Sequence, residues 1–374
     1  MKRARIVSTR DRQRIRAALD TSEDSVELTI GGHAFGVTHL SREYWPADAA
    51  TRAPAVTKRD LLCYLVDVAP LLLPHSVDRP LTLFRWPTGI NGRRVRQKHW
   101  QVPVPPFVAR TSIFSNSKGH ADDYILCNNL ATLLWLGHMG ALEMHAWHSR
   151  VTPGTGDGPS STDFARSEAA LQASVIEYPD YILFDIDPFI YSGSEPAGRH
   201  PEFNATAFDR AREVALWLHA LLERTGLAAF VKTSGKTGLH VVVPILRTLR
   251  YDAAREVARL IGEHLLREHP DVVTTEWSVG KRSGKVFIDY NMNVRGKSMP
   301  LPYSLRGLPG APVSMPLDWR DVRRGYPLDY RIDTVPARLA KRGDAWAGVP
   351  GVRQDLSAIF ARSRGASALS PRTR

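Results

Sequence analysis

The chain contains 374 residues, 43% of them hydrophobic, so it is long enough for one large or two ordinary domains with a buried core and is not disordered. Its 50 lysine and arginine residues exceed its 38 acidic residues, and the formal charge of +12 favours a polyanionic partner, with nucleic acid as the first choice. The sequence has no uncharged apolar run of about 18 residues, and its basic start lacks the apolar centre of a signal peptide, so we expect a cytoplasmic protein that does not contact a membrane.

Basic residues at the two ends of the chain contribute part of this charge. Solvated termini would explain them, but basic arms also commonly hold phosphates. We therefore treat residues 1–26 as a basic N-terminal arm that has room for a short helix, and residues 349–374 as a basic C-terminal tail. The two cysteines, Cys63 and Cys127, lack CxxC spacing, so neither a structural zinc site nor a disulfide framework is expected.

The segments that follow the arm predict a hairpin and a capped helix. VELTIGGHAFGVTH predicts two strands that turn at Gly31 and Gly32. Thr57 and Asp60 form a capping box, and the apolar residues after them recur at helical spacing. Lys58 lies at the N-terminus of this helix, where bare amides and a lysine can bind an anion, although a solvated first turn explains the pattern equally well.

The next segment combines a strand with a cluster of cations. Residues 81–86 predict the strand, and GRRVRQKHW follows it after a turn. This mixture of cations and an aromatic side chain, which includes Arg96 and Lys98, suits contact with a nucleic-acid backbone and its bases, although a solvated loop is the alternative. Asn129 caps a predicted helix, and the strand after it carries His145, a residue type that is more often part of the core.

Residues 152–163, TPGTGDGPSSTD, predict a surface insertion or a flap over a site. The pattern after residue 179 is strand, helix, strand, turn, strand, helix, strand, which predicts a small sheet with helices on one face. Thr206 and Asp252 are the predicted N-caps of the two helices, and Gly226 ends the first of them. Such a layout resembles the palm of many nucleic-acid polymerases.

Three carboxylates stand at the ends of two apolar strands of this sheet. PDYILFDIDP ends in Asp185 and Asp187, and KVFIDYN contains Asp289. Residues two apart share one face of a strand, and if the strands are neighbours, the three carboxylates can hold two divalent ions about 3.5–4 Å apart for in-line displacement at phosphorus. Oxygen ligands suit Mg²⁺ or Mn²⁺ rather than zinc. The alternative is a pair of solvated turn residues.

The segment SGKTGLH, residues 234–240, predicts a phosphate-binding loop. Its glycines let backbone amides approach phosphate oxygens, and Ser234, Lys236 and His240 can donate hydrogen bonds to a triphosphate. It lacks Walker A spacing, and a plain tight turn would explain the glycines but not the lysine and histidine. Further polar or basic side chains follow the third aspartate and either lie near phosphates or are ordinary solvated groups: Asn293, Arg295, Lys297 and Arg306.

Several motifs follow one another along the chain. In order they are TKRD, RPLTLFRWPTGI, QKHW, GALEMHAWHSR, FDIDP, TSGKTGLHVVVP, FIDYNMNVRGK, PYSLR, PGAPVSMPLDW and VPARLAKRGDAWAG. Over about residues 27–348, these motifs resemble the polymerase domain of bacterial DNA ligase D and related stand-alone primase-polymerases of the archaeo-eukaryotic primase superfamily. The loop at 152–163 and the SGKTGLH form look more like the stand-alone members, some of which are linked to DNA ligase C and excision repair.

The resemblance implies an α+β (α/β) primase-polymerase fold, with a small RRM-like palm sheet that carries the catalytic carboxylates and an N-terminal α/β lobe. The implied catalytic domain, residues 27–348, is made of four parts. They are a DNA- and 5′-phosphate-binding lobe at 27–150, a linker or flap loop at 151–178, the palm at 179–310 and a closing segment at 311–348.

The resemblance also implies roles for individual residues. Asp185, Asp187 and Asp289 would be the catalytic ligands of two Mn²⁺ or Mg²⁺ ions. The incoming nucleotide would be held by His145, Ser234, Lys236, His240 and Arg306. Lys58, with Arg42 in the place of a family lysine, would grip a 5′-phosphate, and Arg96 and Lys98 are the other expected DNA contacts.

The function that the resemblance implies is that of a bacterial, nucleoid-associated DNA repair polymerase. Such enzymes add a few nucleotides, prefer ribonucleotides over deoxynucleotides and are typically activated by manganese. The expected task is end joining, excision-repair gap filling or priming, and the expected partners are NTPs or dNTPs, gapped or broken duplex DNA with a 5′-phosphate, a DNA ligase of C or D type, and Ku. The alternative is a non-catalytic DNA-end-binding scaffold that recruits a ligase or Ku, although a pure binder gains nothing from clustered negative charge near DNA.

Three departures from the family pattern affect substrate placement. Val95 and Arg96 stand where the family often has two adjacent phenylalanines that stack on the template. Met292 stands where a glutamine is common, and the stretch between Pro46 and Lys58 is longer than usual. We therefore do not expect template stacking at positions 95 and 96.

Overall fold

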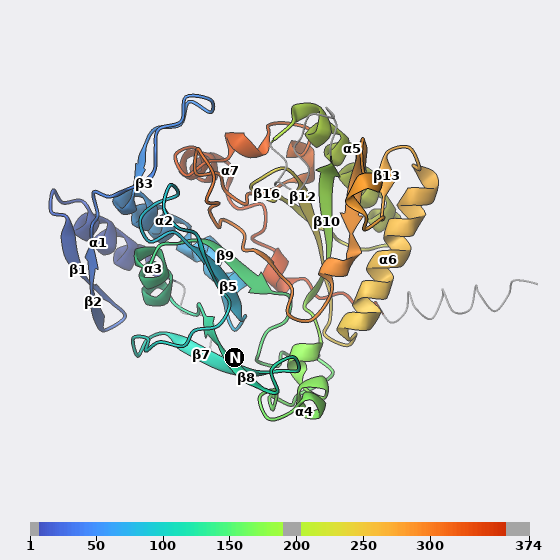
Figure 1. The fold of residues 1–374 in the computed structure, drawn as a ribbon, viewed down its shortest axis with the longest axis horizontal. Helices are drawn as coiled ribbons and strands as arrows, with labels where there is room; N and C mark the ends of the chain where they lie inside the picture. The colour runs from blue at the N-terminus through green and yellow to red at the C-terminus, as the bar shows by residue number, and fades with distance from the viewer. Residues whose placement is uncertain (1–6, 190–202, 357–374) are drawn as a thin grey trace, which may run out of the picture.

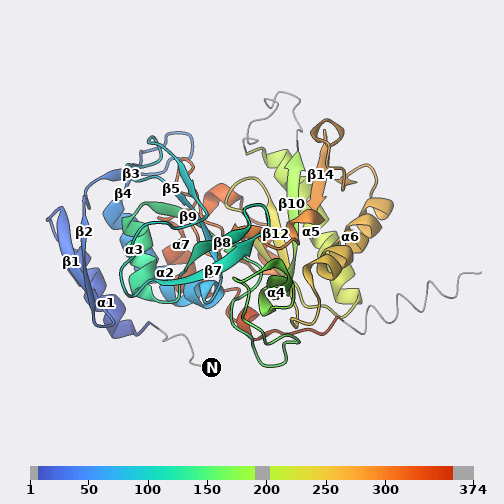
Figure 2. The same ribbon diagram turned by 60° about the horizontal axis from the view of Figure 1, so that its bottom comes forward.

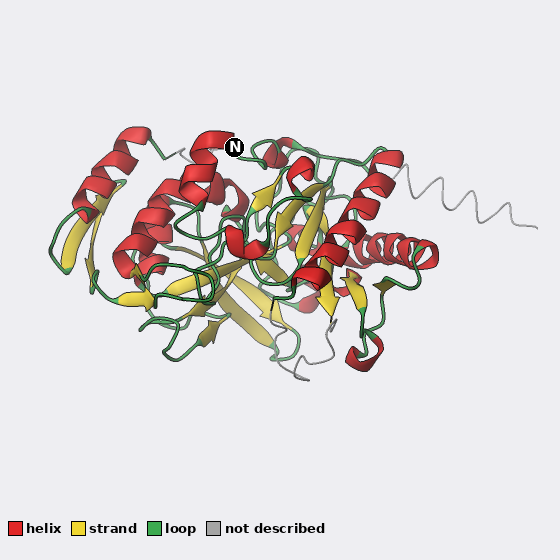
Figure 3. Cartoon of the chain, turned by 90° about the horizontal axis from the view of Figure 1, so that it is seen from above, coloured by secondary structure: helices red, strands yellow, loops and turns green. Residues whose placement is uncertain are grey.

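The computed structural model describes residues 7–189 and 203–356, which form two halves that lie side by side (Figures 1 and 2). One half holds the N-terminal helices and a four-stranded sheet, and the other holds a six-stranded sheet with two long helices. Figure 3 shows the strands of the two sheets in the interior, between helices at either end. This arrangement confirms the predicted mixed α and β fold class. No helix in the described ranges is long and apolar enough to cross a membrane.

The N-terminal half begins with a helix and a hairpin and continues with two short strands and a long helix. These are α1 (Thr9–Leu19), β1 (Ser25–Ile30), β2 (His33–Thr38), β3 (Glu43–Trp45), β4 (Val56–Thr57) and α2 (Lys58–Ser76). The hairpin turns at Gly31 and Gly32, and the Thr57–Asp60 capping box is present, both as predicted. The described part of the predicted basic arm is not free, because Ile15 and Leu19 of α1 are buried in the core that α2 shares.

The four-stranded sheet has the order β15-β9-β5-β6, and a separate hairpin and one helix lie beside it. Their bounds are β5 (Leu81–Arg85), β6 (Val95–Gln97), β7 (Ala109–Ser115), β8 (His120–Leu126), α3 (Leu130–His138), β9 (Ala141–Trp147) and β15 (Ser298–Pro300). Asn129 caps α3, as predicted. Strand β15 falls within the predicted palm segment but pairs with β9, so residues after the third aspartate return to the N-terminal half.

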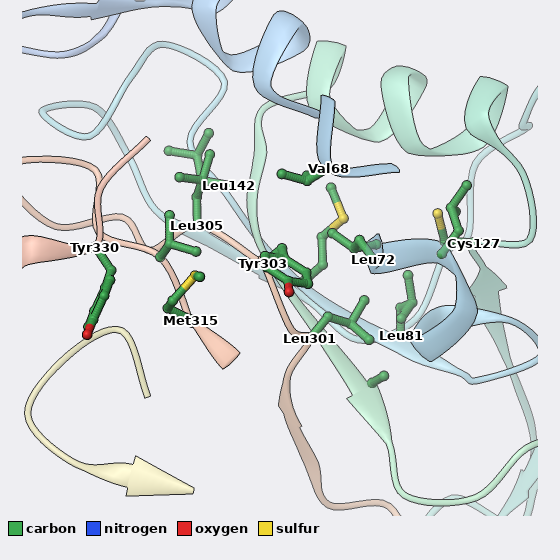
Figure 4. Close-up of a cluster of buried hydrophobic side chains, with 14 of the residues drawn as sticks. Val68, Leu72, Leu81, Cys127, Leu142, Leu301, Tyr303, Leu305, Met315 and Tyr330 are labelled. Carbon is green, nitrogen blue, oxygen red and sulfur yellow. The ribbon is translucent and has the colours of Figure 1, made fainter. Parts of the chain in front are cut away.

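Segments that are distant in the sequence meet in the core below this sheet. Figure 4 shows side chains of α2 and β5 beside those of the segment 301–315, among them Leu72, Leu81 and Leu301. Tyr64 Oη of α2 donates to the carbonyl of Tyr303 over 2.9 Å. The segment 301–315 therefore ties the N-terminal half to the palm.

The palm sheet has the order β13-β14-β10-β12-β11-β16. The strands of this sheet and the two helices that pack on it are β10 (Tyr181–Phe189), α5 (Ala205–Arg224), β11 (Phe230–Thr233), β12 (Leu239–Pro244), α6 (Tyr251–Glu268), β13 (Val273–Thr274), β14 (Lys285–Asp289) and β16 (Pro316–Leu317). Ile182, Phe184 and Ile186 of β10 pack in the same core as α5 and α6, so these helices cover one face. Residues that alternate with them point to the other face. The predicted order of elements is confirmed, with β13 as an additional strand.

Both predicted helix caps in the palm are wrong by two residues. Asn204, not Thr206, caps α5, and its side chain accepts from the backbone N–H of Ala207. Helix α6 begins after Arg250, so Asp252 lies in its first turn. The Arg250 side chain makes no capping bond to α6, and Asp252 Oδ1 accepts from the backbone N–H of Ala253. The path of the chain, and not the residue type alone, sets where each helix begins. Gly226 follows α5 with a positive φ, as predicted.

The connection between the halves is held at the end of the palm sheet remote from the carboxylates. Within the predicted 152–163 loop, the side chain of Asp157 is buried and pairs with Arg247, which follows β12. These contacts favour the surface insertion over the flap. A short helix, α4 (Glu168–Gln172), comes next, and α7 (Val335–Arg342) lies in the closing segment. Residues 1–6 of the arm and 357–374 of the tail lie outside the described residues.

Candidate active site

Polar side chains form a row across the open face of the palm sheet. In the antiparallel register, Asp289 of β14 lies opposite Asp185 of β10, and Asp185 lies opposite His240 of β12. His240 in turn lies opposite Lys232 of β11. Residues directly opposite each other in antiparallel strands point to the same face. The row thus brings together two predicted metal ligands and one predicted nucleotide ligand.

Polar contacts join one end of this row. Lys232 Nζ lies 2.7 Å from His240 Nδ1, and His240 Nε2 lies 3.2 Å from Asp185 Oδ1. Burial, with the positive charges of Lys232 and Arg306, lowers the pKa of His240 well below its usual value, so the ring is neutral. We assign the tautomer in which Nδ1 accepts from Lys232 and Nε2 donates to Asp185, because it satisfies both contacts. His240 therefore orients the carboxylate of Asp185.

Lys232 is a member of the site that sequence reasoning missed. Its side chain is fully buried, and Nζ also donates to Ser314 Oγ over 2.6 Å. Burial and the charge of Arg306 lower the pKa of Lys232 well below its usual value. The signal was in the sequence, since a lysine inside an apolar strand is seldom buried without a partner.

Asp187 lies two residues beyond Asp185 and on the same face of β10. Burial and the negative charges of Asp185 and Asp289 raise the pKa of Asp187 well above its usual value. Burial raises the pKa of Asp185 to about 6, and burial together with Asp185 raises the pKa of Asp289 to about 6. In the protein alone, burial therefore destabilises the charged forms of all three carboxylates, and neighbouring carboxylates add to this effect at Asp187 and Asp289.

The donor set fits a hard divalent cation, because all three side chains offer carboxylate oxygens. Among residues 7–189 and 203–356, however, no group of three His, Cys, Asp or Glu side chains is arranged to hold a metal ion as it stands. The fold brings the predicted ligands to neighbouring positions on one face. Their role as ligands of Mg²⁺ or Mn²⁺ stays a prediction.

The predicted phosphate loop connects β11 to β12 beside the carboxylates. Ser234 Oγ accepts from the backbone N–H of Lys236 and Gly238, so this hydroxyl shapes the loop. A Cβ at Gly238 would lie 2.3 Å from the carbonyl oxygen of Ile186 and 2.9 Å from Asp187 Oδ1. Glycine at this position therefore lets the loop backbone approach the carboxylates.

A second charged group comes from β9 and from the segment after β15. Glu143 Oε2 lies 3.2 Å from His145 Nε2 and 3.2 Å from Arg306 Nη2, and Arg306 Nη1 donates to the carbonyl of Ser234 over 2.9 Å. Burial lowers the pKa of His145 to about 4, so this ring is also neutral. Glu143 was missed, although its spacing of two from His145 in a strand places both on one face.

Arg306 is the point at which the predicted nucleotide ligands meet. It bonds to Ser234, shares Glu143 with His145, and its charge acts on both His240 and Lys236. Burial and Arg306 together lower the pKa of Lys236 to about 8. The five predicted residues thus surround one region, and its excess of buried positive charge suits an anionic ligand.

Two of the downstream residues have structural roles instead. Asn293 is buried and bonds to the backbone N–H and carbonyl of Leu183, over 2.8 Å and 2.7 Å. Arg295 pairs with Glu177 and Glu168. The interpretation of Asn293 and Arg295 as groups near phosphates is therefore wrong. Lys297 is exposed.

The predicted 5′-phosphate residues lie together in the N-terminal half. Lys58 is 3% exposed, and its Nζ donates to the carbonyl of Thr38 over 2.9 Å. Burial and the charge of Arg42 lower the pKa of Lys58 to about 8. His138 is close enough for Lys58 to lower its pKa further, and its buried Nδ1 has no hydrogen-bond partner among the described residues. Lys58 is the buried cation of this cluster and Arg42 is half-buried, and the charge of Asp24 offsets only part of the lowering of the Lys58 pKa.

Arg96, another predicted DNA contact, borders a hollow on β5 and β6. Phe84, Arg94 and Arg96 line a cavity of about 380 Å³. The Arg94 guanidinium lies 4.3 Å from the ring centre of Phe84, which in turn contacts the ring of His145. Lys98 follows β6 and is half-buried. Arg94 therefore stacks on Phe84 next to positions 95 and 96, where this chain lacks the two phenylalanines that the family often has.

Known proteins share this architecture. Residues 57–346 match the family model described as LigD, primase-polymerase domain. The chain is 30% identical over 289 residues to the Bacillus subtilis bifunctional non-homologous end joining protein LigD, covering 77% of this chain and 40% of that protein. It is 28% identical over 297 residues to the Mycobacterium tuberculosis multifunctional non-homologous end joining DNA repair protein LigD, covering 78% of this chain and 34% of that protein.

A solved structure described as the polymerase domain from Mycobacterium tuberculosis ligase D in complex with DNA superposes with a TM-score of 0.67. The sequence identity is 27%, and the match covers 84% of this chain and 97% of that chain. The chain thus corresponds to a polymerase domain and spans only 34% to 40% of the length of these two relatives.

Proposed function

The chain belongs to the LigD primase-polymerase domain family, and from this premise we propose that it is a DNA repair polymerase that adds nucleotides to 3′-hydroxyl ends at short gaps or double-strand breaks. Its substrates are NTPs and dNTPs, with ribonucleotides preferred. The names of the relatives refer to non-homologous end joining, and a DNA ligase of C or D type and Ku are the partners that we propose for this chain.

The palm carboxylates supply the reaction centre in this proposal. Asp185, Asp187 and Asp289 would hold two Mn²⁺ or Mg²⁺ ions, and such ions would supply activation of a hydroxyl and stabilisation of negative charge on a departing pyrophosphate. His240 fixes the orientation of Asp185 through the 3.2 Å contact. The raised pKa values support this assignment, because a bound cation replaces the proton that each buried carboxylate would otherwise take up.

The cations around Arg306 bind the triphosphate. Arg306 is held by Glu143 and by the Ser234 carbonyl, so its position is fixed before the ligand arrives. Lys236 carries a second positive charge on the loop. Preorganised charges in a site that excludes water stabilise developing negative charge more strongly than mobile charges in solvent do. The neutral rings of His145 and His240 add no further charge, and their contacts with Glu143 and Asp185 hold these two carboxylates in place beside the triphosphate site.

The cluster of Lys58 and Arg42 binds the 5′-phosphate on the far side of a gap. Its support is electrostatic, since a buried lysine beside an arginine is stabilised by an anion. Arg96 and Lys98 of the β6 region contact the DNA backbone in the same proposal. Recognition of the phosphate would distinguish a gap that a ligase can later close from other ends.

The register of Asp185 opposite Asp289 carries the proposal. Primer extension on gapped DNA with Mn²⁺ and ribonucleotides tests it with the Asp185→Ala/Asp187→Ala variant. We expect activity to fall by about a thousand-fold or more, since the metal site contributes several kcal/mol. The matched control, Asp163→Ala/Asp318→Ala, removes two exposed aspartates and should extend normally. Continued extension by the first variant would refute the assignment. If the wild-type protein binds the DNA but incorporates no nucleotide, the result would favour the non-catalytic DNA-end-binding scaffold.

A further inference from the structure

The connection between β13 and β14 carries an exposed tryptophan. Within residues 7–189 and 203–356, the exposed large hydrophobic side chains are Val102, Leu260, Trp277 and Val294. Trp277 is the aromatic one among them, and 62% of it is accessible to solvent. Figure 2 shows this connection as a loop that extends beyond the sheet, above the label of β14. Single exposed apolar residues are common, so the exposure alone carries no conclusion.

A second observation is that Trp277 is held in place without being covered. Arg282 Nε donates to the carbonyl of Glu276 over 2.8 Å, and the same guanidinium bonds to the carbonyl of Trp277. The guanidinium lies 3.6 Å from the ring centre of Phe287 and 5.5 Å from Trp277. Trp277 also meets Phe287 edge-on, with ring centres 6.3 Å apart. The indole is therefore fixed on one side and open on the other.

The position of this platform relates it to the carboxylates. Phe287 lies directly opposite Asp187 in the register of β14 and β10. It is also two residues from Asp289, so it shares the face on which the carboxylates lie. Arg282 is close enough for Asp289 and Asp187 to act on its charge. Trp277 is thus separated from the reaction centre by the width of one side-chain layer.

The surroundings of Trp277 favour a nucleobase over an apolar partner. Lys281 is 69% exposed and pairs with Glu276, and Arg282 gives the same connection a net positive charge. A protein-docking surface would require a contiguous apolar patch, which one tryptophan among cations does not provide. A tryptophan face bordered by cations matches the combination of stacking and backbone charge that binds single-stranded nucleic acid.

We propose that Trp277, supported by Arg282 and Phe287, is a stacking platform for an unpaired nucleobase of a DNA strand that enters the carboxylate site. This inference rests on the proposed function, because it identifies part of the DNA-binding surface of that site. The platform recognises single-stranded DNA within a nucleotide or two of the reaction centre. Stacking on an aromatic face does not depend on base identity, so the platform accepts any sequence.

The test measures binding of fluorescently labelled DNA by anisotropy, without nucleotide or divalent metal. The substrates are a blunt duplex and a duplex with a short single-stranded 3′ overhang. We expect Trp277→Ala to weaken binding of the overhang DNA by about tenfold, as for loss of one stacked base, with little effect on the blunt duplex. Trp277→Phe keeps an aromatic face and should retain most of the affinity. Leu260→Ala, which removes an exposed apolar side chain from α6, is the matched control.

A second arm locates the base. One abasic site is moved along the overhang, and in the wild type we expect binding to weaken at one position. In Trp277→Ala that position should no longer matter. Equal affinity of wild type and Trp277→Ala for the overhang DNA, or equal losses on both DNAs, would overturn the platform. Primer extension by the wild type is scored separately, so its absence would count against the proposed function while the binding comparison still decides the platform.

Discussion

The palm contains a group of buried carboxylates, and the N-terminal half contains a buried lysine beside a half-buried arginine. In the palm, burial raises the pKa of Asp185, and burial together with neighbouring carboxylates raises the pKa values of Asp187 and Asp289. In the N-terminal half, burial and Arg42 lower the pKa of Lys58. Both groups are destabilised in the protein alone, and a ligand of opposite charge relieves each of them. The difference between them is in construction. Strand register sets the palm site, while a helix cap and several loops set the other.

Among single substitutions, the largest effect that we expect concerns Lys232, whose amine contacts His240, which in turn contacts Asp185. Lys232→Met keeps most of the volume but removes the donors to His240 and Ser314. We expect kcat/KM for nucleotide incorporation to fall by roughly 10- to 100-fold, as for other residues that orient metal ligands. Affinity for DNA should not change. Steady-state kinetics and DNA-binding titrations measure the two quantities.

Thermal unfolding separates positioning from structure in this variant. Lys232→Met removes the cost of burying an amine but leaves His240 Nδ1 without a donor, so the two effects oppose each other and the variant should unfold close to the temperature of the wild type. Lys341→Met, an exposed change on α7, is the control for the loss of a charge. A parallel loss of stability and activity in Lys232→Met would show that the residue only supports the fold, and the proposed asymmetry between the two sites would be weakened.

The second effect belongs to the N-terminal half. Lys58→Ala should weaken binding to 5′-phosphorylated gaps by about tenfold, because a hydrogen bond between charged groups contributes about 1.5–3 kcal/mol. Binding to the same gap without the phosphate should hardly change, since Lys58 is buried and does not contribute to the general basic surface. Titration of the two DNAs measures the ratio. Equal losses on both would remove the phosphate pocket from the proposal.

The fold of the palm was largely predictable because its signals are local. The alternation in YILFDIDP determines which residues of β10 face the helices, and the carboxylates follow from the same alternation. Long-range pairing was not predictable. The strands β15 and β16 are too short to show a pattern, and each joins a sheet through partners that are distant in the sequence. The burial of α1 likewise depends on α2, which the sequence of the basic arm does not reveal.

The candidate site shows the same division. The aspartates and the loop at residues 234–240 were identified from local motifs, and register then placed them together. Lys232 and Glu143 were missed because each looks like an isolated charge until the opposite strand or sheet is known. Arg295 was misassigned for the same reason but with the opposite outcome. It was taken for a group near phosphates, whereas its partners Glu177 and Glu168 come from a distant segment. Charges whose partners are distant in sequence cannot be sorted into structural and functional groups by pattern alone.

The smallest effect that we expect is a pH dependence of phosphate recognition. Burial and Arg42 lower the pKa of Lys58 to about 8, so the free protein holds the ammonium form below that pH and loses it above. The preference for 5′-phosphorylated over unphosphorylated gaps should therefore decline by several-fold as the pH rises from about 7 to about 9, by at most tenfold per pH unit. The titration of the 5′-phosphate cannot explain such a decline, because raising the pH only adds to its negative charge, and the phosphate is already almost fully ionised at pH 7. Lys58→Arg supplies the control, because a guanidinium stays charged throughout and should give a flat ratio. A flat ratio in the wild type as well would mean that Lys58 does not carry the recognition, and the symmetry between a cation-binding palm and an anion-binding N-terminal half would no longer hold.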